Sequence, residues 1–286
     1  MKKRTKVAGL VIILVILAVW GVKTYIKLQK PAIGIIKVEG GITSAMESLE
    51  TIKGYEDDES IKAVLVRIDS PGGIVGPSQE IYQRLLKLKG KKPIIVSMGA
   101  LGASGAYYIA CAADTIYALP GTLTGSIGVL MEFVDVSEGI AKLGIKAGSI
   151  TSGNLKDAGS PFRPMTEVER AYFKDVIDDT HAQFVEAVAK GRRLPIDKVR
   201  ELANGRIYTG RQAKNLGLVD RLGGYDQALE EAKRLAGITG EPRIVQPAEP
   251  LGFFELAGRF LDGYAPHSLK TGGGSLRTVR LEYRIF

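Results

Sequence analysis

The chain has 286 residues with a formal net charge of +8, and 45% of its residues are apolar, enough for a substantial hydrophobic core. Its one cysteine excludes an intramolecular disulfide, and its two histidines lack the spacing of metal ligands, so we expect no metal and no cofactor. Two basic clusters bracket an apolar stretch near the N-terminus, and no basic stripe interleaved with aromatic residues occurs in the rest of the chain, which argues against a nucleic-acid partner.

The N-terminus has the pattern of a membrane anchor. Residues 7–22 form an uncharged apolar run with basic residues on both sides. A membrane span needs about 20 apolar residues, and Trp20 and Lys23 occupy the region where a small-residue cleavage site would have to stand. We therefore predict a single-pass transmembrane anchor over residues 7–26 in the inner membrane, with a cytoplasmic N-terminus and an extracytoplasmic remainder. A cleaved secretory signal is the alternative.

Strand-like and helical patterns alternate after residue 32. The predicted strands are residues 33–40, 63–69, 93–99, 115–120 and 126–134. The predicted helices are residues 44–55, 77–89, 103–113, 166–192, 195–205, 225–237 and 251–264, with a short helix after residue 210. A Thr-x-x-Glu capping box opens the longest helix. This alternation predicts an α/β fold with a mostly parallel sheet and flanking helices, in which functional sites gather at the C-terminal ends of strands.

The predicted elements divide the chain into five parts. These are a basic N-terminus (residues 1–6), the anchor (7–26), a linker (27–32), one α/β domain (33–264) and a flexible tail (265–286). Near its end the tail has three successive glycines followed by alternating apolar and polar residues. Two interpretations of this last stretch stay open: disorder, or addition as a strand in a peptide groove, for example one of the protein's own.

Two motifs stand directly after predicted strands and carry candidate chemistry. Ser104, flanked by Ala103 and Gly105, can project its hydroxyl from the start of a helix, whose N–H groups favour a developing negative charge. Alternatively, this serine only caps the helix. The sequence Ser-Pro-Gly-Gly at residues 70–73 lets backbone N–H groups point into a cavity, although it also suits an ordinary glycine turn.

The base for such a serine is less evident from the residues. His181 falls inside a predicted helix among charged residues, and His267 lies in the Gly- and Pro-rich tail. A lysine can replace histidine if its pKa falls well below about 10.4. Lys156 stands in a small, polar, glycine-containing loop, but composition alone does not select it. Cys111 lies in an apolar run and is expected to be a buried core residue.

Five motifs in order along the chain resemble the short form of signal peptide peptidase A, of peptidase family S49. They are DSPGG (69–73), SMGALGASGAYYIACAAD (97–114), TLTGSIGV (122–129), SGNLKDAGSP (152–161) and GRIYTGRQAKNLGLVD (205–220). The resemblance covers about residues 33–236. It implies a ClpP/crotonase-like fold and a serine protease that uses a Ser/Lys dyad.

Transferred to this sequence, the resemblance implies that Ser104 is the nucleophile and Lys156 the general base. Gly73 and Gly105 would supply the oxyanion-hole N–H groups, and Ser126 would orient the lysine amine, unless it only caps a turn. The resemblance further implies remnant signal peptides as substrates, the membrane as a partner, and a homo-oligomeric ring in which neighbouring subunits share the dyad.

Other functions remain open from the sequence. A membrane-bound ClpP-class protease of the stomatin-operon kind would share the glycine motif and the Ser/Lys chemistry. An acyl-CoA enzyme of the crotonase fold would also use a backbone oxyanion hole but would need neither the dyad nor a membrane span. A membrane scaffold or inhibitor that retains the fold belongs to a third class, without catalysis.

Overall fold

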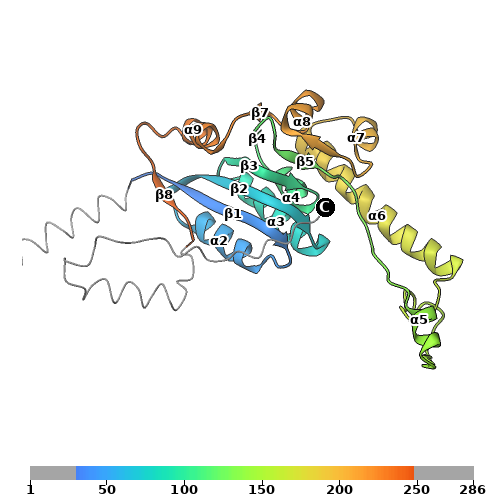
Figure 1. Ribbon diagram of the computed structural model, residues 1–286. Helices are drawn as coiled ribbons and strands as arrows, with labels where there is room; N and C mark the ends of the chain where they lie inside the picture. The colour runs from blue at the N-terminus through green and yellow to red at the C-terminus, as the bar shows by residue number, and fades with distance from the viewer. Residues whose placement is uncertain (1–29, 248–286) are drawn as a thin grey trace, which may run out of the picture. The chain divides into compact units, whose positions relative to one another are not determined.

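An eight-stranded sheet forms the centre of residues 30–247, the part of the chain that this computed structural model describes (Figure 1). Its strands run in the order β6-β5-β3-β2-β1-β8, and β4 pairs with both β3 and β7. All pairs are parallel except β5 with β6, which confirms the predicted mostly parallel sheet. The strands are β1 (Ala32–Ile42), β2 (Ile61–Gly73), β3 (Ile94–Ala103), β4 (Thr115–Ala118), β5 (Leu123–Gly125), β6 (Ile207–Thr209), β7 (Arg221–Leu222) and β8 (Arg243–Val245).

Helices cover both faces of the sheet. They are α2 (Met46–Asp57), α3 (Val75–Lys89), α4 (Gly105–Ala110), α5 (Ser137–Lys142), α6 (Glu167–Arg192), α7 (Ile196–Leu202), α8 (Gly210–Leu216) and α9 (Tyr225–Leu235). The larger core cluster joins one face of the sheet to α2, α3, α4 and the C-terminal half of α6. A smaller cluster joins the other face to α9.

The central strands have uninterrupted apolar sequences because both of their faces are buried. In β2, Val64 and Val66 belong to the larger core cluster, whereas Ala63 and Leu65 belong to the smaller one. Successive strand residues point to opposite faces, so a strand covered on both sides needs apolar residues at every position. The central strands therefore stand out clearly in the sequence.

The long helix α6 extends from the core towards the segment that carries α5 (Figure 1). With 26 residues it is about 39 Å long at 1.5 Å per residue. Phe184 and Val188, in its C-terminal half, are buried in the core. Its N-terminus has the predicted capping box, in which Thr166 and Glu169 each bond to the other's backbone N–H. We refer to residues 130–166, together with the N-terminal half of α6, as the arm.

The predicted strand at residues 126–134 is wrong. The strand in this region is β5, which ends at Gly125, and residues 126–136 have no regular structure. Gly125 and Ser126 have φ values of +80° and +49°, and this left-handed pair turns the chain out of the sheet. Ile127 is still buried, but the large apolar residues after it, Leu130, Met131, Phe133 and Val134, are exposed, so their apolar pattern did not reflect burial in the sheet.

Several predicted segments fall outside the described residues: the basic N-terminus, the membrane anchor, most of the linker, the helix at residues 251–264 and the tail. Within residues 30–247, no helix has both the length and the apolar content to cross a membrane.

Candidate active site

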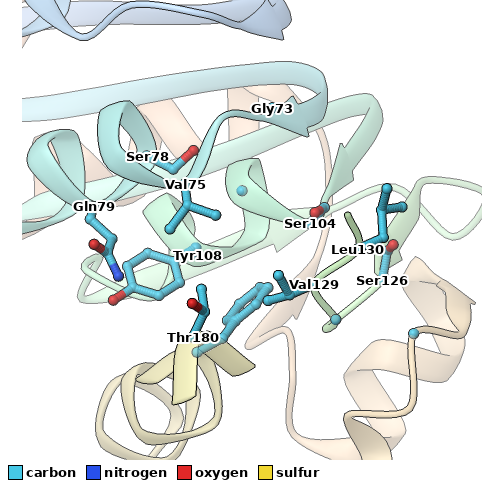
Figure 2. Close-up of a pocket in the computed structure, with 14 residues that line it drawn as sticks. Gly73, Val75, Ser78, Gln79, Ser104, Tyr108, Ser126, Val129, Leu130 and Thr180 are labelled. Carbon is cyan, nitrogen blue, oxygen red and sulfur yellow. The ribbon is translucent and has the colours of Figure 1, made fainter. Parts of the chain in front are cut away.

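The C-terminal ends of β2 and β3 lie side by side and open onto a cavity of about 450 Å³. Four of the predicted site residues line it, as Figure 2 shows for Gly73, Ser104 and Ser126. The full lining is Gly73, Val75, Ser78, Gln79, Ser104, Gly105, Tyr108, Ser126, Gly128, Val129, Leu130, Thr180, Phe184 and Gly205. The sheet therefore brings together residues that are more than 50 positions apart in the sequence.

Ser104 forms a one-residue turn between β3 and α4. Its φ of 54° and ψ of −125° lie outside the usual regions for a residue with a side chain, a conformation that costs about 1–3 kcal/mol. The backbone is held on both sides, because Ser104 N donates to Gly125 O at 2.9 Å and Ser104 O accepts from Tyr108 N at 2.9 Å. The hydroxyl makes no capping bond to α4. The capping interpretation of this serine is therefore wrong, and its side chain faces the cavity.

The end of β2 passes against Ser104 at a distance that only glycine allows. A Cβ atom at Gly72 would lie 2.6 Å from Gly105 N and 2.8 Å from Ser104 Cβ, and Gly72 has a φ of +98°. A Cβ atom at Gly105 would lie 3.3 Å from Gly73 N. The backbone nitrogens of Gly73 and Gly105 thus lie close to each other and to Ser104.

The Gly-Gly pair is not a turn, because β2 continues through it. Gly72 and Gly73 pair with Gly41 and Ile42 of β1, after a register shift. Two buried serines that the sequence analysis did not select fix this strand end. Ser70 Oγ donates to Gly40 O at 2.6 Å and accepts from Gly72 N at 3.1 Å. The second serine, Ser78, packs under Gly105.

Ser126 lines the same cavity and directly follows β5, the strand that pairs with the end of β3. Its backbone N–H donates to Arg206 O at 2.9 Å, and its φ of +49° aims the residue away from the sheet. Both Ser104 and Ser126 are therefore placed by unusual backbone conformations on neighbouring strands, β3 and β5. The sequence Thr-Gly-Ser at this position signals such a turn only through its glycine.

Apolar side chains form the opposite wall of the cavity, where Tyr108 and Phe184 meet with ring centroids 5.1 Å apart. Val75, Val129 and Leu130 also line the cavity, with Leu130 beside Ser126 (Figure 2). Such a surface suits an apolar side chain of a bound peptide. The sequence analysis did not select these residues: Tyr108 and Val129 lie within quoted motifs but were given no role, and Val75, Leu130 and Phe184 come from separate elements.

The cavity contains no group that could deprotonate Ser104. Among the described residues, those that line it include no lysine, histidine or carboxylate, and Tyr108 is its single titratable side chain. Burial raises the pKa of Tyr108 above its ordinary value, so this phenol stays protonated near neutral pH. Cys111 is buried as predicted, and burial raises its pKa to about 12. His181 lies on α6 and does not line the cavity.

Lys156 lies in the arm, apart from the cavity. It belongs to an exposed turn in which its N–H donates to Gly153 O at 3.1 Å. The surrounding segment connects α5 to the N-terminal end of α6 (Figure 1), whereas the residues of α6 that line the cavity, Thr180 and Phe184, lie in the C-terminal half of that helix. A single chain thus unites Gly73, Ser104, Gly105 and Ser126 but leaves Lys156 outside.

Comparisons with known proteins find relatives that are named as proteases. The family model described as peptidase family S49 matches residues 87–239. A Synechocystis sp. protein named as a protease is 42% identical over 222 residues, which are 77% of this chain and 79% of that protein. An Enterococcus faecium protein named as signal peptide peptidase SppA is 37% identical over 206 residues, or 72% of this chain and 60% of that protein. The chloroplastic serine protease SPPA of Arabidopsis thaliana is 34% identical over 72% of this chain and 30% of its own length.

Proposed function

Because the chain belongs to peptidase family S49 and is a serine protease, we propose that Ser104 is its nucleophile and Lys156 its general base. The observation that carries this assignment is the position of Ser104. Its hydroxyl projects from a left-handed turn into a cavity where the backbone nitrogens of Gly73 and Gly105 stand close together. The ClpP/crotonase-like fold belongs to the same proposal, supported by the parallel sheet that ends at this backbone pair.

The proposed reaction is peptide hydrolysis through an acyl-enzyme. Neutral Lys156 takes the proton of the Ser104 hydroxyl, and the oxygen attacks the scissile carbonyl carbon. The N–H groups of Gly73 and Gly105 donate to the resulting oxyanion, and losing one such donor typically costs about 2.7–4 kcal/mol of barrier. The lysine ammonium then protonates the leaving amine as the peptide C–N bond breaks. Water, deprotonated by the same lysine, releases the acyl group, while Ser126 orients the amine.

We assign the lysine to a neighbouring copy of the chain, within a homo-oligomeric ring. The cavity has no base of its own among the described residues, and Lys156 is exposed in the arm. The arm also exposes large apolar side chains: Leu130 is 76% exposed, Val134 68% and Leu143 75%. Apolar residues concentrated on one exposed segment are typical of a protein–protein interface. A copy seated on this segment would cover these side chains as it completes the dyad.

The proposed substrates are remnant signal peptides and other unstructured apolar peptides. The apolar wall formed by Tyr108 and Phe184 supports this preference, since it can receive an apolar side chain next to Ser104. The proposed anchor over residues 7–26 would hold the catalytic domain on the outer side of the inner membrane, where such peptides remain after secretion.

Hydrolysis of an apolar, unstructured peptide by the full-length protein tests the assignment. We expect Ser104→Ala and Lys156→Ala each to lower kcat by about a thousandfold or more, and a fluorophosphonate probe to label Ser104 in the wild type. In the wild type, the rate should rise with pH as the lysine loses its proton. Rates close to wild type in either variant would overturn the proposed dyad. Absence of both hydrolysis and labelling in the wild type would favour a scaffold.

A further inference from the structure

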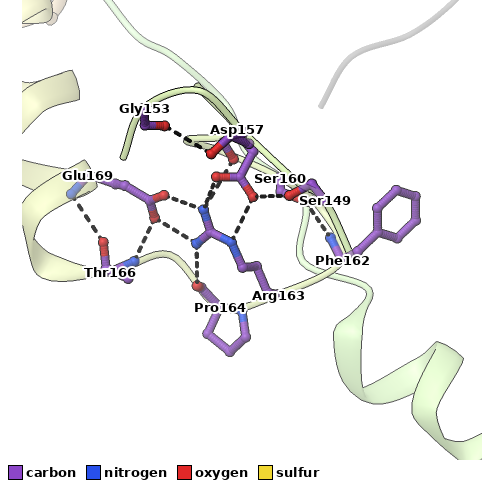
Figure 3. A network of polar contacts seen from close by, with 10 residues as sticks. Ser149, Gly153, Asp157, Ser160, Phe162, Arg163, Pro164, Thr166 and Glu169 are labelled. Carbon is purple, nitrogen blue, oxygen red and sulfur yellow. Dashed lines mark hydrogen bonds and ion pairs between the residues drawn. The ribbon is translucent and has the colours of Figure 1, made fainter. Parts of the chain in front are cut away.

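A compact polar network holds the residue that follows Lys156. The guanidinium of Arg163 lies between the carboxylates of Asp157 and Glu169, as Figure 3 shows. Asp157 is the direct neighbour of Lys156 in the chain, and Glu169 lies in the first turn of α6. One side chain therefore connects the turn that carries Lys156 to the start of the long helix.

The contacts use almost the whole donor set of Arg163. Its Nε donates to Asp157 Oδ2 at 3.3 Å, and its Nη2 donates to Asp157 Oδ1 at 2.9 Å. Nη1 donates to Glu169 Oε2 at 3.0 Å, and Nη2 also contacts the other oxygen of Glu169. Nη2 further reaches the backbone O of Asp157 at 3.2 Å. This two-sided fork fixes orientation as well as distance, which a lysine at this position would not do.

The Glu169 end of the network is a firm attachment point. The side chain of Glu169 is only 3% exposed, and its Oε2 also accepts from Thr166 N at 2.9 Å. The hydrogen bonds from Arg163 hold the pKa of Glu169 at about 2. Because this carboxylate is buried and ionised, it depends on Arg163 as a counter-charge.

Both oxygens of the Asp157 carboxylate accept hydrogen bonds within the network. Oδ1 accepts from Arg163, and Oδ2 accepts from Arg163 and from Ser149 Oγ, the latter at 2.7 Å. These hydrogen bonds, chiefly those from Arg163, lower the pKa of Asp157. An ionised carboxylate next to Lys156 would otherwise be available to pair with the lysine ammonium and oppose its deprotonation.

We propose that Arg163 is a positioning residue for the general base: it fastens the Lys156 turn to the start of α6 and keeps the Asp157 carboxylate away from the lysine amine. This inference rests on the proposed function, since it presumes that Lys156 acts as the base. In the ring, a base carried on an arm must reach a neighbour's cavity with a defined geometry, and a misplacement of 1 Å can cost about a hundredfold in rate.

Other charged groups near the network do not substitute for Arg163. Asp135, from the segment beside α6, and Arg170 and Lys174, from α6 itself, line the cavity that also contains Arg163. Asp135 accepts from Ser137 N, while Arg170 and Lys174 form ion pairs with carboxylates of their own helix. In residues 30–247, Arg163 is the cation whose ion pairs join Asp157 to Glu169.

Steady-state kinetics of the full-length protein over a range of pH tests this role. In Arg163→Gln we expect kcat to fall by about 10- to 100-fold, with KM within about twofold, because the peptide cavity is elsewhere. The acid limb of the kcat profile should move up by about one pH unit, since the freed Asp157 carboxylate favours the protonated lysine. Adding Asp157→Asn to this variant should return the limb to its wild-type position while kcat stays low. Arg163→Lys should recover only part of kcat.

Arg170→Gln is the matched control, because it removes an arginine of the same helix end whose ion pair with Glu167 is exposed. We expect its kcat and pH profile to match the wild type. An Arg163→Gln variant that behaves like this control, or an acid limb that does not return in the double variant, would overturn the proposal. If the same preparations show Lys156→Ala to be inactive, the proposed dyad survives that failure.

Asp157→Asn alone covers the case in which Arg163→Gln does not assemble. It weakens the tie to the Lys156 turn and leaves the Arg163–Glu169 ion pair in place. We expect a similar loss of kcat without an upward shift of the acid limb, and unchanged oligomer size and melting temperature. An unchanged kcat in this variant would contradict the positioning role.

Discussion

The two halves of the proposed dyad lie near different parts of α6 and are built in different ways: Ser104 faces a cavity beside the C-terminal half of this helix, and Lys156 lies in the loop before its N-terminus. At the core end, Ser104 is fixed by backbone geometry: strand pairing, a left-handed turn and glycines in close approach. At the arm end, Lys156 is exposed and its turn is held by side-chain hydrogen bonds around Arg163. The proposed nucleophile and the proposed oxyanion hole thus lie together in one chain, whereas the proposed base depends on a polar network and on a neighbouring copy.

This difference predicts how substitutions in each region affect folding and catalysis. A change in the backbone at the core end has no room to be absorbed, because protein interiors are close-packed. A change in the arm leaves the core intact and alters the placement of Lys156. Substitutions at the core end should therefore affect folding and catalysis together, while those in the arm should separate them.

The largest expected effect is that of Gly72→Ala. The new Cβ would lie 2.6 Å from Gly105 N, at a backbone φ of +98° that disfavours any side chain. We expect kcat/KM to fall by about a thousandfold, comparable to losing oxyanion stabilisation, and unfolding free energy to fall by about 1–3 kcal/mol. Peptide hydrolysis and urea unfolding measure the two effects.

Gly76→Ala, four residues later, is the control. This glycine lies in α3, and its added Cβ would meet no atom within 4 Å. The same substitution there should leave activity unchanged and stabilise the helix slightly. Equal behaviour of the two variants would show that the close approach at Gly72 does not matter.

The two halves of α6 provide the next contrast. Phe184 is 5% exposed and packs on Tyr108, so Phe184→Ala should lower the unfolding free energy by about 3–5 kcal/mol. Val168, at the arm end of the helix, is 70% exposed. Val168→Ala should change the unfolding free energy by about 0.5 kcal/mol or less. Denaturant unfolding of both variants measures the difference. Similar losses would mean that the arm is as tightly packed as the core.

The smallest expected effect concerns acid stability. The pKa of Glu169 is about 2, below the ordinary value of 4.5, so the unfolded state binds more protons between these pH values. Glu169 therefore contributes stability above about pH 4.5 that is lost as the pH falls towards 2. Glu169→Gln should flatten this part of the pH dependence in equilibrium unfolding.

Glu56 offers the comparison in the core region. Hydrogen bonds from Lys91 and Arg84 hold its pKa at about 2 as well, so its contribution should persist in the Glu169→Gln variant. If Glu169→Gln leaves the slope of unfolding free energy against pH unchanged between pH 4.5 and 2, a strong Arg163–Glu169 interaction is contradicted.

The core end was largely predictable from the sequence. Strands buried on both faces leave continuous apolar runs, and Ser-Pro-Gly-Gly and Ala-Ser-Gly follow two of them directly. The close approach of Gly72 to Ser104 was not predictable in detail, since it depends on the register between β2 and β3. Periodicity therefore located the site, and the structure supplied its contacts.

The arm was predicted less well, because several of its apolar residues are exposed, whereas the sequence analysis expects apolar residues in a strand pattern to be buried. Leu130 and Val134 resemble strand residues in the sequence, yet they are exposed and belong to no strand. The capping box of α6 was predicted, since it is a local pattern. The bridge from Arg163 to Asp157 depends on how the intervening loop folds back, so no spacing rule reveals it. Lys156 itself was selected only by family resemblance.

The most direct test of the shared dyad is to mix inactive subunits. Ser104→Ala chains keep Lys156, and Lys156→Ala chains keep Ser104, so a mixed ring contains some interfaces with both groups intact. Co-expression of equal amounts should restore about a quarter of wild-type hydrolysis, if subunits mix at random around a head-to-tail ring. No recovery in rings shown by mass to contain both chains would contradict a dyad formed between neighbours.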